Sequence, residues 1–283
     1  MELLTKTYTI NVGGRLMDLS ETKVMGILNV TPDSFFSGSR KQSEEEIRQR
    51  VQQIVSEGGQ MIDIGAYSSR SGADDVSQKE EMERLAKGMK IVREIAPDIP
   101  VSVDTFRADV AKMAVEELGA DIINDISGGE LDKEMFPTVA KLGVPYILMH
   151  MKGNPQTMQQ STQYDDFLKE VLLYFAEKIQ QLRDLGQKDI ILDPGYGFAK
   201  TLEQNYELLY HQDALSIFEL PILAGISRKS MIYRLLGTTP EEALNGTSVL
   251  NTIAMQKGAN ILRVHDIREC VEVVKIVSQL YLS

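Results

Sequence analysis

The feature that most constrains the fold is a repeated alternation of short apolar runs with helical stretches. Each run is rich in β-branched and large apolar residues, as expected for parallel strands that are covered on both faces. The eight runs occupy residues 24–30, 61–66, 101–105, 122–127, 146–150, 190–195, 222–227 and 261–266. Eight strand–helix units in 283 residues predict one α/β domain over residues 1–283, closed as a (β/α)8 TIM barrel. An open doubly wound sheet is the alternative, because periodicity does not show closure.

Local signals place the other elements. Residues 1–20 are expected to form an N-terminal β-hairpin, because two short alternating runs flank Gly13-Gly14, a pair suited to a turn with positive φ. Residues 166–186 have the clearest amphipathic helical pattern. Helix starts are predicted at three capping boxes and one threonine–proline pair: Ser43…Glu46, Ser77…Glu80, Thr201…Gln204 and Thr239-Pro240.

Composition limits the class of partner and the compartment. The formal net charge of −11 argues against nucleic acid or an anionic membrane as the main partner, because both are bound through basic patches. No apolar run approaches the roughly 20 residues that span a bilayer, and the amino terminus lacks the pattern of a signal peptide. A single cysteine, Cys270, fits a reducing compartment. A cytoplasmic protein with small-molecule partners is therefore expected.

Polar side chains end almost every apolar run. In a β/α barrel the carboxyl ends of the strands open onto one face, where active sites are built. Taken singly, such residues are as readily explained as polar loop residues or helix caps. Four of them lie within or at the edge of apolar runs, where an unpartnered polar group costs about 1–3 kcal/mol: Asp63, Asp104, Asn124 and Arg263. A shared ligand would supply partners for all four.

The chemistry of the strand-end residues narrows the ligand. Carboxylate and amide groups suit a flat heterocycle with a guanidine-like edge, and they are offered by Asp104, Asn124 and Asp193. Cationic donors for phosphates are offered by Arg70, Arg263, Lys229 and His265. Oxygen ligands of the kind that Mg²⁺ uses beside substrate phosphates are offered by Asn29 and Asp33. A nitrogen heterocycle carrying a diphosphate with magnesium meets all three requirements.

Six segments, in order along nearly the whole chain, carry a family resemblance. They are Asn29-Val-Thr-Pro-Asp-Ser-Phe35, Val103-Asp104-Thr105, Ile123-Asn124-Asp125, Asp193-Pro-Gly-Tyr-Gly-Phe198, Ser227-Arg-Lys-Ser230 and Arg263-Val-His-Asp266. Together they resemble the signature segments of dihydropteroate synthases. The resemblance implies a sulfonamide-targeted, homodimeric transferase of folate biosynthesis. It would condense 6-hydroxymethyl-7,8-dihydropterin diphosphate with p-aminobenzoate, giving 7,8-dihydropteroate and pyrophosphate with help from Mg²⁺.

The same resemblance implies roles for individual residues. The pterin would lie among Asp104, Asn124, Met149, Asp193, Gly197 and Lys229. The diphosphate would meet Asn29, Arg70, Arg263 and His265, with Mg²⁺ on Asn29 and Asp33. The p-aminobenzoate would sit beside Ser69, Phe198, Lys229 and Ser230. The expected catalytic set is Asp104, Lys229, Arg263 and His265, acting electrostatically on a dissociative, cation-like transition state.

One segment departs from the family pattern. Where the family usually reads Glu-Ser-Thr-Arg-Pro-Gly, this chain has Tyr67-Ser-Ser-Arg-Ser-Gly72. Serine in place of proline removes a fixed φ and is expected to leave this loop less preorganised. Two other functions remain open from the sequence: a methyltetrahydrofolate-dependent methyltransferase, which would not need the diphosphate set, and a non-catalytic pterin-binding paralogue.

Overall fold

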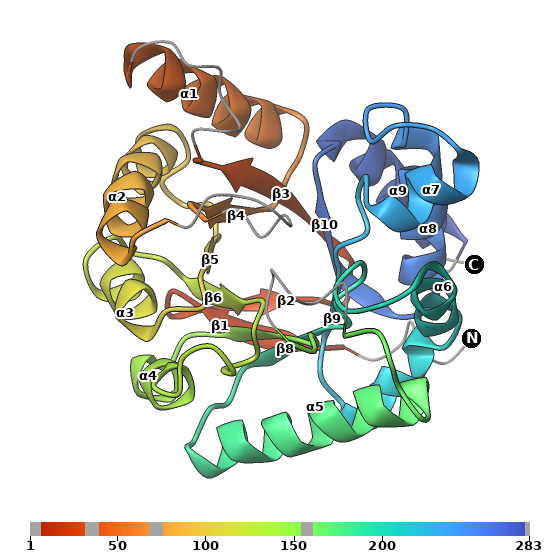
Figure 1. Cartoon of the computed structure of the whole chain (residues 1–283). Helices are drawn as coiled ribbons and strands as arrows, with labels where there is room; N and C mark the ends of the chain where they lie inside the picture. The colour runs from red at the N-terminus through yellow and green to blue at the C-terminus, as the bar shows by residue number, and fades with distance from the viewer. Residues whose placement is uncertain (1–6, 32–39, 68–75, 154–160, 281–283) are drawn as a thin grey trace.

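The computed structural model describes residues 7–31, 40–67, 76–153 and 161–280. Within them, eight parallel strands form a closed barrel in the order β10-β3-β4-β5-β6-β7-β8-β9 (Figure 1). The strands span Lys23–Asn29 (β3), Met61–Gly65 (β4), Val101–Asp104 (β5), Ile122–Asp125 (β6), Tyr146–Met149 (β7), Ile190–Asp193 (β8), Ile222–Ala224 (β9) and Ala259–Val264 (β10). Each of the eight overlaps one predicted run, and β9 is the shortest, covering only the first half of the run 222–227. The pairing of β10 with β3 closes the sheet, so the barrel is confirmed and the open sheet is excluded.

Helices surround the barrel (Figure 1). They span Arg40–Ser56 (α1), Gln78–Ile95 (α2), Ala108–Glu116 (α3), Met135–Leu142 (α4), Phe167–Asp184 (α5), Leu202–Tyr210 (α6), Ser230–Leu236 (α7), Leu244–Gln256 (α8) and Ile267–Gln279 (α9), with a 3₁₀ helix at Gln212–Phe218 (η4). No helix in this described part of the chain combines the length and apolar character needed to cross a bilayer. The helix over 166–186 is confirmed as α5.

Two predicted helix starts hold and two are wrong. Thr201 forms a full capping box with Gln204, and the side chain of Ser77 accepts a hydrogen bond from the backbone of Glu80. Ser43 lies inside α1, which begins at Arg40. Thr239-Pro240 lies in a turn before α8, which begins at Leu244. The backbone N–H of Ala243 donates to the Pro240 carbonyl, and the guanidinium of Arg228 also donates to the carbonyls of Pro240 and Glu241.

The predicted N-terminal hairpin is confirmed and seals one end of the barrel. Strands β1 (Thr9–Val12) and β2 (Arg15–Asp18) pair antiparallel around Gly13 and Gly14, which both have positive φ. Side chains of the hairpin segment join a buried apolar cluster with the lower interior of the barrel: Ile10, Val12, Leu19, Met25, Met61, Ile122, Ile147, Ile191, Leu223 and Ile261. The amino-terminal end of the barrel is therefore a packed core that water does not enter.

Candidate active site

The interior of the barrel becomes polar two positions further along five of its eight strands. Side chains alternate along a strand, so the residue two positions after an inward-pointing residue also points inward. Two positions beyond the apolar interior layer, the inward-pointing residues are Ile27, Asp63, Asn124, Met149, Asp193, Gly225 and Arg263. Asp104 joins them from β5, two positions after Ser102. The carboxyl end of the barrel thus carries a ring of polar and charged groups.

Arg263 is the hub of this ring. Its Nε lies 2.6 Å from Oδ2 of Asp63, and its Nη2 lies 3.3 Å from Oδ2 of Asp104. The Asn124 amide donates to the same Asp63 carboxylate at 3.2 Å. Asp63 is fully buried. Its position inside the apolar run 61–66 marks it as a residue near a shared ligand, but no pterin, diphosphate or p-aminobenzoate role is predicted for it. Four residues from four strands therefore form one connected polar cluster.

Burial and mutual repulsion disturb the titration of the acids. Burial, followed by the neighbouring Asp63 carboxylate, raises the pKa of Asp104 to about 8, although Arg263 opposes the shift. Burial also raises the pKa of Asp193 against the pull of Lys229. For Arg263, burial alone would lower the pKa, but the carboxylates of Asp63 and Asp104 outweigh it and raise the pKa. At neutral pH the free site therefore holds the Arg263 cation beside an Asp104 carboxyl that retains its proton.

The cluster is not internally satisfied. The Oδ1 atom of Asn124 is buried and has no hydrogen-bond partner among the described residues. An unpaired acceptor of this kind costs about 1–3 kcal/mol, and it sits beside acids that can both donate and accept. The arrangement fits a ligand that presents alternating N–H and carbonyl groups along one edge.

The loop after β8 forms one wall of the mouth. Lys229 donates a hydrogen bond to the carbonyl of Tyr196, and its Nζ lies 4.5 Å from the ring centre of Phe198. Gly197 has a φ of 82°, and a Cβ there would lie 3.2 Å from Cδ of Lys229, so glycine permits this approach. Burial lowers the pKa of Lys229 to about 8. Phe198 packs with Met149 in an apolar cluster that completes the wall.

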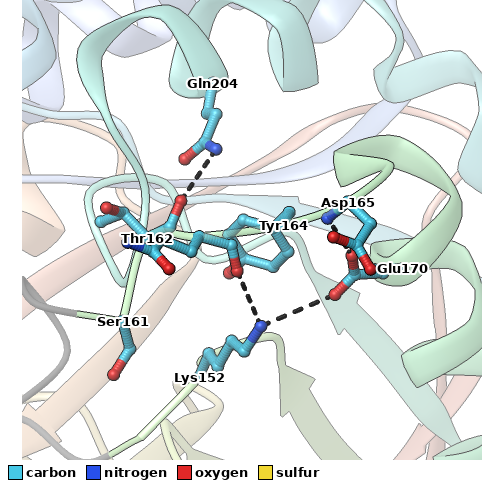
Figure 2. Close-up of a pocket in the computed structure, with 8 residues that line it drawn as sticks. Lys152, Ser161, Thr162, Tyr164, Asp165, Glu170 and Gln204 are labelled. Atoms are coloured by element: carbon cyan, nitrogen blue, oxygen red, sulfur yellow. Dashed lines mark hydrogen bonds and ion pairs between the residues drawn. The ribbon is translucent and has the colours of Figure 1, made fainter.

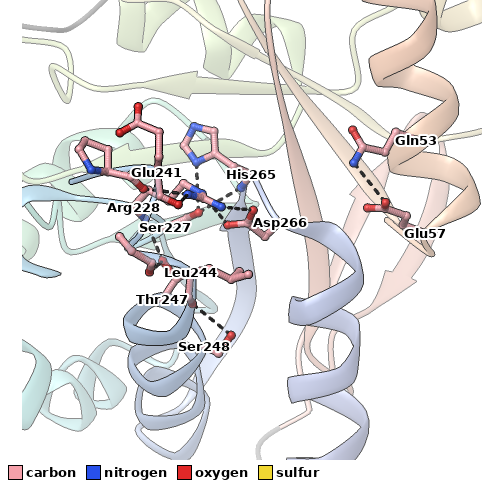
Figure 3. A network of polar contacts seen from close by, with 12 residues as sticks. Gln53, Glu57, Ser227, Arg228, Glu241, Leu244, Thr247, Ser248, His265 and Asp266 are labelled. Carbon is pink, nitrogen blue, oxygen red and sulfur yellow. Dashed lines mark hydrogen bonds and ion pairs between the residues drawn. The ribbon is translucent and has the colours of Figure 1, made fainter. Parts of the chain in front are cut away.

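Two further segments meet beside the mouth (Figure 3). Arg228 forms a two-pronged ion pair with Asp266, through contacts of 2.9 and 2.8 Å, and so joins the start of α7 to the end of β10. Ser227 Oγ accepts the backbone N–H of His265 at 3.1 Å and lies 3.1 Å from Nδ1 of the same ring. In the tautomer that carries its proton on Nε2, Nδ1 accepts the Ser227 hydroxyl proton and the Nε2–H is left for a ligand.

The charge expected for His265 is wrong. Burial, helped by the nearby guanidinium groups of Arg263 and Arg50, lowers the pKa of His265 to about 4. The ring is therefore neutral at pH 7 in the free site and offers one N–H, not a positive charge. The sequence could not show this, because Arg50 comes from α1 and reaches the His265 carbonyl, at 2.6 Å, from 215 residues away.

Most of the predicted site residues converge on the mouth. The structure gathers Asp104, Asn124, Met149, Asp193, Gly197, Phe198, Lys229 and Arg263 there, with His265 directly after β10 and Ser230 half-buried at the first position of α7. Asn29 ends β3 at the level of Asp104, because both pair in register with Gly65. The predictions for Asp33, Ser69 and Arg70 fall on residues outside the described part of the chain.

The described residues offer little to a free metal ion. No group of three or more histidine, cysteine, aspartate or glutamate side chains among them could hold one. Asn29, however, is exposed at the rim. Mg²⁺ characteristically keeps few protein ligands and completes its shell with water and substrate phosphates. One amide oxygen at the rim fits that pattern.

A separate polar hollow of about 730 Å³ lies beside the start of α5 and is not the mouth of the barrel (Figure 2). Its groups pair with one another: Lys152 Nζ lies 2.8 Å from the carbonyl of Gln163 and 3.6 Å from Glu170, and Gln204 donates to the carbonyl of Thr162. None of the predicted site residues lines it.

Comparison with known proteins decides the family. The family described as pterin binding enzyme matches residues 25–265. The chain belongs to the pterin-binding enzyme family. It is 41% identical to the dihydropteroate synthase of Escherichia coli K12 over 268 residues, covering 93% of each chain. Over 274 residues it is 42% identical to the dihydropteroate synthase of Synechocystis, covering 95% of this chain and 94% of that one.

Solved structures of pterin-binding enzymes agree. The Yersinia pestis dihydropteroate synthase, determined with a sulfonamide drug complex, superposes with a TM-score of 0.88 at 39% identity and covers 98% of this chain and all of its own. The Xanthomonas albilineans dihydropteroate synthase with 4-aminobenzoic acid gives a TM-score of 0.90 at 34% identity, covering 98% and 99%. The chain is accordingly an enzyme of the dihydropteroate synthase type, a transferase of folate biosynthesis. The methyltransferase alternative is set aside.

Proposed function

We propose that this chain joins 6-hydroxymethyl-7,8-dihydropterin diphosphate to p-aminobenzoate at the mouth of the barrel, releasing pyrophosphate. The observation that supports this most is the buried, incompletely paired cluster of Asp63, Asp104, Asn124 and Arg263, which lacks the groups a pterin edge would supply. The ligands in the Yersinia and Xanthomonas structures belong to the same chemistry.

The pterin ring is recognised by the acids and amide of the mouth. Its guanidine-like edge donates to the carboxyl groups of Asp193 and Asp104. Asn124 offers both an N–H and the unpaired Oδ1, and Lys229 donates to the ring carbonyl. Met149 and Gly197 supply the flat surfaces on which a ring can lie. Because Asp104 keeps its proton to about pH 8 in the free site, a bound cation-like ring would draw it into the carboxylate form.

The diphosphate is held by neighbouring donors. Arg263 contributes the firm cation, His265 contributes its Nε2–H, and Arg70 is proposed as a second cation. Mg²⁺ is proposed at Asn29 and Asp33, where it would neutralise charge on the departing phosphates. These residues stabilise negative charge as it develops on the leaving group, so their effect is expected on kcat as well as on KM.

The chemistry needs no nucleophilic side chain. The C–O bond to the diphosphate breaks with its electron pair on pyrophosphate, and the methylene cation is delocalised into the electron-rich dihydropterin. The neutral aryl amine then forms the C–N bond and loses a proton. Phe198, Lys229, Ser230 and Ser69 are proposed to hold the p-aminobenzoate. No covalent enzyme intermediate forms, and a pterin-modified side chain trapped during turnover would contradict this.

A homodimer in the cytoplasm is also proposed. Large apolar side chains on the last helices remain more than half exposed in the single chain, among them Leu235 and Leu236 of α7 and Ile276 of α9. Exposed apolar groups on one side of a molecule are typical of a surface that another chain covers. Sedimentation of the purified protein tests this, and a mass equal to one chain at micromolar concentration would contradict it.

A coupled assay of pyrophosphate release tests the function. With the pterin diphosphate and Mg²⁺, release is expected to require p-aminobenzoate. Release without p-aminobenzoate would indicate hydrolysis. No release together with tight pterin binding would indicate a non-catalytic binding protein, and the proposal would be abandoned.

A further inference from the structure

The loop between β8 and α6 contains a buried lysine that none of the expected roles includes. Lys200 is 4% exposed, and within the described residues no carboxylate contacts its side-chain nitrogen. Burial lowers the pKa of Lys200 to about 7, although Asp193 opposes the shift. Its Nζ lies 2.9 Å from the carbonyl of Gly195, 3.0 Å from the carbonyl of Phe198 and 3.0 Å from Nδ1 of His150, with the His150 carbonyl next at 3.3 Å. The three shortest contacts match the three N–H groups of an ammonium.

These partners belong to two neighbouring segments at the mouth of the barrel. Gly195 and Phe198 lie in the loop that carries Gly197, whereas His150 directly follows Met149 at the end of β7. One ammonium therefore joins the loop to the neighbouring strand end. His150 is itself 3% exposed, and burial followed by the charge of Lys200 keeps its pKa well below the ordinary value, so its Nδ1 is available as an acceptor.

The loop needs such a tie because its backbone is unusual. Gly195, Gly197 and Ala199 all have positive φ, and alanine rarely adopts that conformation. A Cβ at Gly195 would lie only 2.1 Å from the His150 carbonyl, so the loop and the strand end touch through their backbones. The carbonyls of Gly195 and His150 both accept from the Lys200 side chain, so one donor group joins the loop to the strand end at this close contact.

We propose that Lys200 is a positioning residue, whose buried ammonium ties the Gly195–Phe198 loop to the end of β7 and so fixes the Phe198 wall against which the arylamine substrate lies. The inference rests on the proposed function for the identity of that substrate. It does not place Lys200 in contact with either substrate.

Steady-state kinetics on Lys200→Met, which keeps the length of the side chain and removes its donors, tests the proposal. We expect KM for p-aminobenzoate to rise about tenfold, the equivalent of one charged hydrogen bond, while kcat and KM for the pterin diphosphate each change less than about threefold. Lys200→Arg, which keeps charge and donors, is expected to recover part of the loss. The matched control is Lys188→Met, at an exposed lysine just before β8.

Hydrogen exchange supplies a readout that does not depend on turnover. Amides of residues 195–199 are expected to exchange at least about tenfold faster in Lys200→Met than in the wild type, because the loop opens locally, and to be unchanged in Lys188→Met. If the wild type shows no activity, the proposed function fails, but this measurement still decides the role of Lys200.

Three results would overturn the proposal. They are an unchanged KM for p-aminobenzoate, a fall in kcat alone, or unchanged exchange at residues 195–199. If Lys200→Met does not fold, His150→Phe, which removes one of the three acceptors, must show the same selective rise in KM and faster exchange at a smaller size. If His150→Phe shows neither the rise in KM for p-aminobenzoate nor the faster exchange, the proposal is equally overturned.

Discussion

The two ends of the barrel are built from the same strands but differ in their inward-pointing side chains. Along a strand, the side chain two positions further on also points into the barrel. At the amino-terminal end, Met61 on β4 and Ile261 on β10 pack against the hairpin in a dry apolar cluster. Two positions further, the same strands present Asp63 and Arg263, a buried ion pair. Burying apolar side chains contributes about 1.5–3 kcal/mol each, whereas a buried charge pair is close to neutral or unfavourable for stability. The apolar amino-terminal end stabilises the fold, and the polar carboxyl end depends on that stability to keep its charged groups in position.

The largest expected effect comes from breaking the polar end. Asp104→Asn keeps the shape and removes the carboxylate that faces the developing cation. We expect kcat/KM to fall about a thousandfold, equivalent to about 4 kcal/mol. The free energy of unfolding at pH 7 should stay the same or rise, because the variant removes a carboxyl from beside Asp63. Initial rates and urea unfolding check both. A variant that retains a tenth of the activity would contradict the comparison.

Damage to the apolar end should have the opposite profile. Met61→Ala, at a fully buried position, is expected to lower the free energy of unfolding by about 2–5 kcal/mol through the cavity it leaves. The kcat/KM of the folded enzyme should change less than about threefold. Leu16→Ala, at a hairpin side chain that is 78% exposed, is the matched control and should lie within about 0.5 kcal/mol of the wild type.

A pH series sharpens the comparison. The pKa of Asp104 is raised to about 8 in the folded protein, so between about pH 4 and 8 the folded state binds the extra proton. The stabilising contribution of protonated Asp104 to the free energy of unfolding is therefore fully present below about pH 4 and is lost as the pH rises towards 8. Urea unfolding at pH 5 to 8 should show that the free energy of unfolding of Asp104→Asn increases relative to that of the wild type as the pH rises. Asp98→Asn, at an exposed carboxylate, should show no such trend.

The ion pair beside the mouth should show a mixed effect. Arg228→Met removes the two contacts to Asp266 and leaves that carboxylate without its guanidinium partner (Figure 3). Stability should fall by about 1–3 kcal/mol. Displacement of the adjoining Lys229 should lower kcat/KM about 10- to 100-fold. Lys257→Met breaks a more exposed pair with Asp213 and should cost under about 1 kcal/mol with activity intact. If both variants change stability and kcat/KM equally, Arg228 has no role in positioning the site.

The smallest effect is expected at Ser227. Ser227→Ala removes the hydroxyl that lies 3.1 Å from Nδ1 of His265 and so helps to orient the ring. We expect kcat/KM to fall about tenfold, the value of one hydrogen bond, with little change in stability. Pre-steady-state pyrophosphate release checks it. An unchanged rate would show that the orientation of the ring is set elsewhere.

Much of the architecture was readable from the sequence because strand residues alternate. A run such as Met61-Ile-Asp-Ile-Gly65 places its acid on the same face as its methionine, so an acid at the mouth follows directly from an apolar residue below it. The family segments then placed Asp104, Lys229 and Arg263 at one opening. Closure of the barrel needed the β10–β3 pairing, which joins opposite ends of the chain and leaves no local pattern.

What the sequence could not give depends on distant contacts. The neutral state of His265 arises from burial and from Arg50 on α1. The tie made by Lys200 requires knowing that Gly195 and His150 meet. At Thr239-Pro240 the predicted helix start is a turn, and the carbonyls of Pro240 and Glu241 also accept hydrogen bonds from Arg228. In each case a side chain contacts a backbone carbonyl that no local sequence pattern assigns to it.

The division of labour between the two ends is tested most directly by measuring one pair of variants in parallel. Asp104→Asn and Met61→Ala should each be assayed for kcat/KM of pyrophosphate release and for the free energy of unfolding. Asp104→Asn is predicted to be nearly inactive and fully stable, and Met61→Ala to be nearly fully active and much less stable. If both variants lose activity and stability in the same proportion, the two ends are not separate in function and this account is wrong.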